Sequence, residues 1–264
     1  MTCFKTVSTI GMKKWGFFIL LFTLTLWGHA QNGALFEEAT KAYNGGNYEK
    51  ATENYLKILD NGEHSPELYF NLGNAYYKLN RIAPSIYYYE KALLLKPNDP
   101  EIRNNLSYAQ NMTLDAIEKM PDTGLSKIYK GITRLLSFDQ WAKLAVVCII
   151  LFVSLFIAFF NFRYSSRKRM AFIISMVFLF TAALSIVLAF MQYNDFKKDR
   201  PAIIFAEEIV IKSEPNDRSQ NVFTLHEGTR VNVLDSLNQW KKIRIADGKT
   251  GWLMGESIKM LKDF

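Results

Sequence analysis

The chain has 264 residues, 49% of them hydrophobic, and a formal net charge of +7 from 32 basic and 25 acidic side chains. Residues 121–200 carry 11 basic and 4 acidic side chains, whereas residues 31–120 carry 9 and 12, and residues 201–264 carry 9 of each. Because a nucleic-acid-binding protein would display its basic excess on a folded domain, this distribution argues against nucleic acid as a partner.

Residues 1–30 have the pattern of a secretory signal peptide. Lys5, Lys13 and Lys14 precede the apolar run Trp15–Trp27, and small residues follow at Gly28 and Ala30. A basic segment, a short apolar core and a small-residue cleavage site are typical of such leaders. An uncleaved anchor is the alternative. In both cases the chain from residue 31 begins outside the cytoplasm.

Residues 32–112 contain a 34-residue repeat. Ser65-Pro66-Glu67 recurs as Asp99-Pro100-Glu101, and each triplet predicts a helix start with a capping side chain and Pro at the first helical position. The period and the small and aromatic positions resemble the tetratricopeptide repeat. We expect repeats at 32–65 and 66–99 and a capping helix at 100–112, whose Asn104, Asn105 and Asn111 would face solvent. Two and a half units are fewer than the three usually needed for a stable array.

The resemblance to tetratricopeptide repeats implies a concave groove that binds a peptide or a helix of a partner. Its lining would come from the first helix of each unit, at Tyr43, Phe70, Asn74, Tyr77, Lys78 and Tyr108. The alternative is that Asn74 belongs to the structural consensus of the repeat and that the aromatic residues are core.

Residues 113–140 form a predicted membrane-proximal linker with an amphipathic helix. Apolar side chains recur at helical spacing, and basic ones lie on other faces: Leu125, Ile128, Ile132 and Leu135 against Lys127, Lys130 and Arg134. Such a helix fits a membrane interface. The pattern alone fits packing against the repeats equally well.

Two apolar segments, residues 141–162 and 170–193, are each long enough to cross a membrane as a helix. The short basic loop 163–169 between them contains four Lys and Arg residues and is predicted to be cytoplasmic. No Asp, Glu, His or Arg lies deep in either segment, which argues against an ion path. The sequence therefore predicts a helical hairpin anchor, with the repeats and the C-terminal region on the outer side as two separate lobes.

Residues 201–264, after a charged linker at Asp195–Pro201, change to a period of two and predict about five short strands in a small barrel. Trp240 and the closing Gly248-Lys249-Thr250-Gly251-Trp252 resemble the bacterial SH3-like domain. That resemblance implies a ligand face at Trp240 and Trp252. Core packing is the alternative function of these two side chains.

The sequence contains no recognisable active site. Its three histidines, His29, His64 and His226, have no metal-ligand spacing, and no phosphate-binding loop or nucleophile elbow occurs. Cys3 and Cys148 leave both outer lobes without a thiol. We therefore expect no catalytic residue, metal or cofactor.

The order of leader, tetratricopeptide array, paired spans and SH3-like barrel resembles the BatE-type proteins of bacterial aerotolerance (Bat) operons. The resemblance implies a multidomain inner-membrane scaffold with both lobes in the periplasm, acting with von Willebrand A-domain membrane proteins and a MoxR-type ATPase. The second hypothesis is an anchor that binds peptidoglycan through the barrel. Membrane lipid is the other expected partner.

Overall fold

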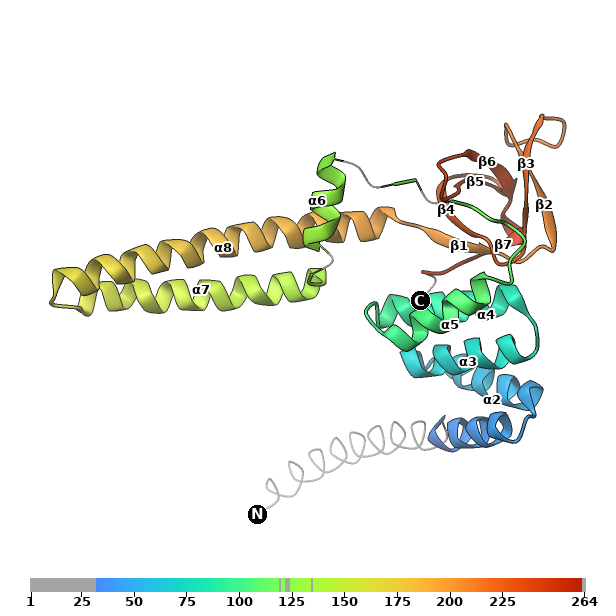
Figure 1. Ribbon diagram of the computed structural model, residues 1–264, viewed down its shortest axis with the longest axis horizontal. Helices are drawn as coiled ribbons and strands as arrows, with labels where there is room; N and C mark the ends of the chain where they lie inside the picture. Colours follow the sequence, from blue (N-terminus) through green and yellow to red (C-terminus); the bar gives the residue numbers. More distant parts are fainter. Residues whose placement is uncertain (1–31, 119, 122–123, 134, 263–264) are drawn as a thin grey trace, which may run out of the picture. The chain divides into compact units, whose positions relative to one another are not determined.

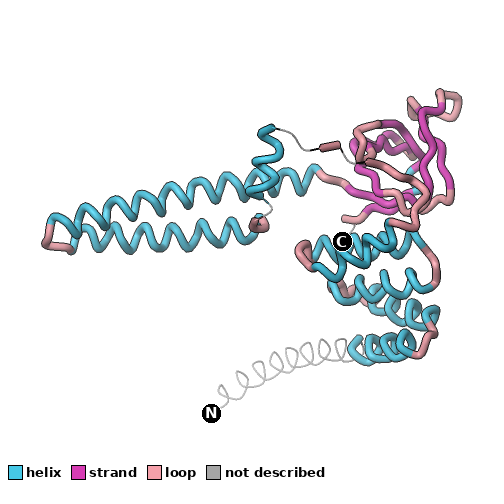
Figure 2. Tube along the Cα trace, viewed as in Figure 1, coloured by secondary structure: helices cyan, strands magenta, loops and turns pink. Residues whose placement is uncertain are grey.

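The structure, a computed structural model, describes residues 32–118, 120–121, 124–133 and 135–262 (Figure 1). The expected signal peptide, residues 1–30, lies outside this range. The chain forms two compact units: one combines the residues up to Ile117 with those from Pro201 onward, and the other contains Glu118–Arg200. The first unit mixes helices and strands, and the second is helical (Figure 2).

The repeat region consists of paired antiparallel helices. They cover residues 32–44, α2 (Tyr48–Asp60), α3 (Pro66–Lys78), α4 (Ile82–Leu95) and α5 (Pro100–Gln110). Ser65 Oγ accepts a hydrogen bond from the Leu68 N–H at 3.1 Å. Asp99 Oδ1 accepts from the N–H groups of the first turn of α5. The two predicted helix starts at Pro66 and Pro100 are confirmed.

The helices cross closely where the sequence places small residues. A Cβ added to Gly73 in α3 would lie 2.5 Å from Cδ1 of Tyr89 in α4. Ser85 Oγ donates a hydrogen bond to the Gly73 carbonyl at 2.9 Å. Tyr89 and Ala92 are buried at the same crossing. The alternation of small and aromatic residues is therefore a packing device.

The second unit contains a hairpin of two helices, α7 (Phe138–Asn161) and α8 (Ser165–Lys198), after the short helix α6 (Gly124–Thr133). Both α7 and α8 are long and apolar enough to cross a membrane. Small side chains are buried between them, at Ala145, Cys148, Ala171, Ala182 and Ser185, as is common where membrane helices pack.

The helices extend beyond the predicted spans 141–162 and 170–193. Ser137 and Gln140 form a capping box that starts α7 at Phe138. At the tip, only residues 162–164 are non-helical, so Arg167, Lys168 and Arg169 of the expected loop 163–169 lie in the first turns of α8. Hydropathy marks only the apolar part of a helix, whereas Arg and Lys are good helix formers that continue it.

The C-terminal region forms an antiparallel sheet with more strands than the five or so predicted. Its seven strands are β1 (Pro201–Ile204), β2 (Glu208–Lys212), β3 (Asn221–His226), β4 (Arg230–Leu237), β5 (Trp240–Arg244), β6 (Thr250–Met254) and β7 (Ile258–Met260). They are ordered β3-β2-β6-β5-β4-β1-β7. A hairpin turn after Leu237 joins β4 to β5, with Asn238 at φ 52°. This antiparallel sheet is consistent with an SH3-like domain.

The strand β1 joins the sheet to the helical array. All four of its side chains are buried. Ala202 and Ile204 point into the core of the sheet, whereas Ile203 lies in the cluster of α4 and α5, together with Leu261. Successive side chains of a strand point to opposite faces. Ile203, which lies between Ala202 and Ile204 in the strand, therefore packs on the array.

The prediction of two separate lobes is wrong, because the array and the barrel share a hydrophobic core in one unit. The predicted linker Asp195–Pro201 shrinks to residues 199–200, since α8 continues to Lys198 and β1 begins at Pro201. The start of the predicted linker 113–140 also belongs to this unit, where Ile117 packs against the barrel core. A contact between segments about 100 residues apart leaves no local pattern in the sequence.

Candidate functional site

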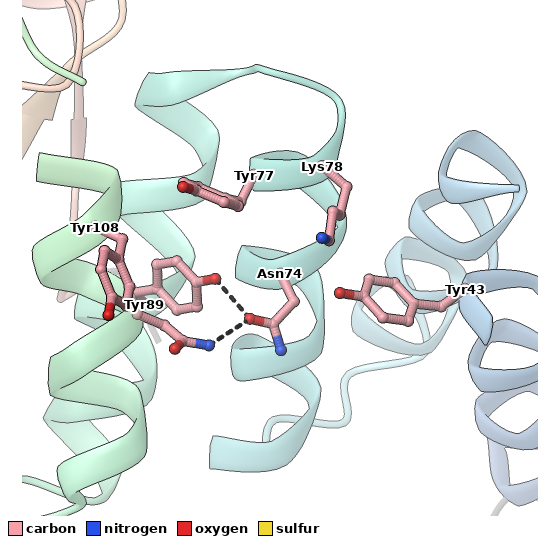
Figure 3. A pocket seen from close by; sticks show the side chains of 7 residues that line it. Tyr43, Asn74, Tyr77, Lys78, Tyr89 and Tyr108 are labelled. Atoms are coloured by element: carbon pink, nitrogen blue, oxygen red, sulfur yellow. Dashed lines mark hydrogen bonds between the residues drawn. The ribbon is translucent and has the colours of Figure 1, made fainter. Parts of the chain in front are cut away.

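A pocket of about 240 Å³ lies between the first helices of the repeat units. It is lined by aromatic and amide side chains and by one lysine: Tyr43, Asn74, Tyr77, Lys78, Tyr89, Asn105 and Tyr108 (Figure 3). Small-molecule sites typically measure about 300–1,000 Å³. The pocket therefore suits one or two side chains of a protein segment better than a whole cofactor.

Asn74 in α3 is the polar centre of the pocket. Its Oδ1 accepts one hydrogen bond from the Tyr89 hydroxyl at 2.6 Å and another from Asn105 Nδ2 at 2.9 Å (Figure 3). These bonds occupy the carbonyl oxygen of the amide and hold the side chain in place. Within the described residues, the Asn74 Nδ2 group has no hydrogen-bond partner and remains a donor for a ligand.

The electrostatic character of the pocket comes from Lys78 and the phenol groups. No acidic side chain is among the lining residues. Burial, with a smaller effect of the neighbouring Tyr48 and Tyr55, raises the pKa of Tyr43. Burial likewise raises the pKa of Tyr89. The phenols of Tyr43 and Tyr89 are therefore neutral hydrogen-bonding groups. Lys78 is the one basic side chain among the lining residues.

The structure brings five of the six groove residues expected from the sequence to this pocket: Tyr43, Asn74, Tyr77, Lys78 and Tyr108. Phe70 is not among them. Its ring is half-buried and packs against Tyr89, with 5.9 Å between centroids. One helical turn before Asn74, Phe70 points toward the neighbouring helix.

Sequence reasoning missed Tyr89 and Asn105 as pocket residues. Tyr89 belongs to the second helix of its repeat unit, and its hydroxyl donates to Asn74 Oδ1. Asn105 was expected to face solvent, but it donates to Asn74. The 34-residue period does not identify Asn105, because its equivalent in the preceding repeat, Asn71, is not among the lining residues.

The two tryptophans expected to form a ligand face have different surroundings. Trp240 is 8% exposed. Trp252 is half-buried, and Lys242 Nζ lies 5.9 Å from the centroid of its ring. Lys242 pairs directly with Trp252, so these side chains lie on the same face of the sheet. The accessible aromatic surface on this face therefore belongs to Trp252.

Another polar cluster lies where the array meets the barrel. Asp115 follows α5, and its carboxylate accepts three hydrogen bonds from the end of β3 and the next turn. Two come from the backbone N–H and the Nδ1 of His226, each at 2.7 Å, and one comes from the Thr229 hydroxyl. We call this cluster of Asp115, His226 and Thr229 the interface clasp.

The clasp shifts the ionisation of both charged members. Burial of Asp115 raises its pKa, but the hydrogen bonds from His226 and Thr229 outweigh this effect and hold the pKa below its ordinary value. The hydrogen bond to Asp115 raises the pKa of His226 against a smaller opposing effect of burial. The interface is therefore strongest with Asp115 ionised and His226 protonated.

Further contacts around the clasp join the same two modules. Tyr87 in α4 packs edge-on against Phe205, with 5.6 Å between ring centroids, and donates a hydrogen bond to the Met260 carbonyl at 3.3 Å. A long ion pair of 3.7 Å connects Glu90 and Arg230. The barrel therefore covers the side of α4 that a further repeat would cover in a longer array.

Comparison with known families identifies two modules in the chain. Residues 66–99 match the family described as Tetratricopeptide repeat, and residues 209–259 match the Bacterial SH3 domain. A search of curated proteins finds no match to the chain. Both families are typically binding modules. Among the described residues, no cluster of His, Cys, Asp or Glu has the composition of a metal site.

Proposed function

We propose that the protein is a non-enzymatic membrane scaffold whose repeat groove binds an extended segment of a protein partner bearing a carboxylate. The observation that carries this proposal is the pocket around Asn74, where a fixed amide, a lysine and four phenols converge. Repeat arrays bind peptides along such concave surfaces.

The lining residues favour this ligand for two reasons. The Asn74 Nδ2 group can donate to a peptide carbonyl, because its own carbonyl oxygen is already occupied by Tyr89 and Asn105. Lys78, without an acidic neighbour in the pocket wall, can pair with an Asp or Glu side chain or a C-terminal carboxylate. The exposed ring of Tyr108 offers a flat apolar surface beside them.

The proposal places the protein in the inner membrane of a bacterium, with the array and the barrel in the periplasm. The leader pattern of residues 1–30 and the basic tip of the hairpin support this orientation. The resemblance to BatE-type proteins supports a role in a Bat-type aerotolerance complex, with von Willebrand A-domain proteins and a MoxR-type ATPase system as partners. A reporter fused after Phe264 that is active only in the periplasm tests the orientation.

The experiment for the groove is photo-crosslinking in cells with a crosslinking amino acid at position 77, followed by mass spectrometry of the adducts. We expect a discrete protein adduct that is lost with Lys78→Glu or Tyr108→Ser. Lys57→Gln is the matched control, because Lys57 pairs with Glu53 on α2 and does not line the pocket. An adduct that is unchanged in all three variants would remove the groove as the binding site.

Peptidoglycan binding through the barrel is the second candidate function, favoured by the half-buried Trp252 with Lys242 beside it. Deleting the barrel is a poor test, because the array shares its hydrophobic core. Trp252→Ala is preferable. If the barrel holds the cell wall, this variant should stop sedimenting with isolated peptidoglycan while keeping its crosslink from position 77.

A further inference from the structure

The short helix α6 (Gly124–Thr133) has its apolar and basic side chains on different faces. At about 100° per residue, Leu125, Ile128 and Ile132 lie within about 60° of one another around the helix axis. Lys127 lies about 140–160° from Leu125 and Ile132. The side chain of Lys130 and all of Arg134 lie outside the described part of the chain. The three apolar residues define what we call the α6 stripe.

The α6 stripe is exposed within its own unit. Leu125 is 84% exposed, Ile128 61% and Ile132 39%. The helix contacts the hairpin through a neighbouring face instead: the Tyr129 hydroxyl donates to Asp195 Oδ2 at 2.6 Å, and Thr133 is buried. The contact with α8 therefore fixes the helix while leaving the stripe free.

The contact lies at the level where the hairpin changes from apolar to polar. Gln192 Nε2 donates to the carbonyls of Thr133 and Leu136, just beyond the apolar stretch of α8. Phe138 and Tyr193 pack at the same end, with 5.8 Å between ring centroids. Aromatic side chains concentrate where a membrane helix leaves the hydrocarbon core.

The direction of α6 agrees with this position. Figure 1 shows α6 lying across α8 instead of alongside it, near the end of α8 that leads to β1. A helix that crosses a spanning helix lies close to the membrane plane. The outer surface of the hairpin is apolar as well, with exposed residues such as Val146 and Val147 of α7.

We propose that α6 is an interfacial helix that inserts Leu125, Ile128 and Ile132 into the boundary between lipid headgroups and acyl chains. Lys127, on the opposite face, points to the headgroups and water. The occupant of the stripe is the bilayer itself, because α6 is held where the hairpin changes from apolar to polar, and the exposed surface of that hairpin is apolar. Buried apolar area of this kind drives interfacial binding of amphipathic helices.

This inference rests on the proposed membrane location of the hairpin, so the experiment tests the two separately. The full chain, with Cys3 and Cys148 replaced by Ala, is reconstituted in nanodiscs of phosphatidylcholine and phosphatidylglycerol. Single spin labels are placed by Leu125→Cys, Ile128→Cys and Lys127→Cys, and by Ile150→Cys in the middle of α7. The measurement is the accessibility of each label to oxygen, which partitions into lipid, and to a water-soluble nickel complex.

We expect the ratio of oxygen to nickel accessibility to be several-fold higher at positions 125 and 128 than at 127, and highest at 150. A low ratio at 125 and 128 with a high ratio at 150 would overturn the interfacial helix while leaving the hairpin in the membrane. Labels at 125 and 128 that are shielded from both reagents would also overturn it, because the stripe would then be covered by protein. A low ratio at 150 would overturn the membrane hairpin and the proposed function with it.

Discussion

Gly228, in the turn between β3 and β4, is the most informative place to test whether the barrel supports the array. Its φ is +82°, and a Cβ there would lie 2.9–3.1 Å from side-chain atoms of Thr113, Ile86 and Ile82. Two of these neighbours belong to α4, and Ile86 is fully buried. The substitution Gly228→Ala therefore pushes one module away from the other.

The chain offers a matched control in Gly62, whose φ is +80° and which has nothing within 4 Å of an added Cβ. The left-handed backbone alone costs an alanine about 1–2 kcal/mol, so Gly62→Ala should lose about that much stability. Overpacking adds about 1–3 kcal/mol, so Gly228→Ala should lose about 2–5 kcal/mol in total.

Thermal unfolding of the full chain in detergent, followed by tryptophan fluorescence, measures this difference. A unit of this size shifts its midpoint by about 2–4 °C per kcal/mol, so Gly228→Ala should melt about 2–12 °C below Gly62→Ala. Hydrogen exchange should also accelerate in α4, which lies on the far side of the contact. Equal midpoints for the two variants would refute the argument that the barrel presses on the array.

Three further predictions concern the helix crossing at Gly73, the two tryptophans of the barrel, and the interface clasp. Gly73→Ala should lower the free energy of unfolding, measured in urea, by about 3 kcal/mol or more, since its Cβ would overlap the buried Tyr89 ring. An unchanged urea midpoint would mean that α3 and α4 do not cross closely enough at Gly73 to exclude a Cβ. Trp240→Ala should lower the free energy of unfolding by about 3–5 kcal/mol because Trp240 is buried, whereas Trp252→Ala should lower it clearly less. Equal losses would make Trp252 a core residue. Finally, the raised pKa of His226 means that its stabilising effect is complete below the ordinary value of 6.5 and is lost as the pH rises through the folded-state value. The lowered pKa of Asp115 makes its contribution complete above 3.8 and lost as the pH falls. The melting midpoint should therefore be highest between about pH 4 and 6.5, and Asp115→Asn should flatten this profile; an equally steep profile in that variant would exclude the clasp as its cause.

Much of the groove could be predicted because a repeat carries its three-dimensional positions in its period. Tyr43 and Tyr77 are 34 residues apart, as are Asn74 and Tyr108, and each pair occupies equivalent positions on the first helices of successive repeat units. Asn105 and Tyr89 escaped the prediction because their positions in the pocket depend on a hydrogen bond to Asn74 across a helix crossing. Whether a ligand uses this pocket is the subject of the crosslinking experiment.

The sequence by itself determined the local elements. Capping residues fix the starts of α3 and α5, unbroken apolar runs make the long helices of the hairpin, and alternation with turn residues makes the strands of the barrel. Each of these signals acts within a single helix or hairpin.

Only the tertiary structure decided that the array and the barrel form one unit. Ile203 and Leu261 look like ordinary strand-end residues in the sequence, and Asp115 looks like part of a linker. They gain their function when the chain returns from the hairpin and places them against α4 and the end of β3. The free energy of that contact comes from surfaces that are distant in the chain, so a short array can complete its core with a barrel instead of a third repeat.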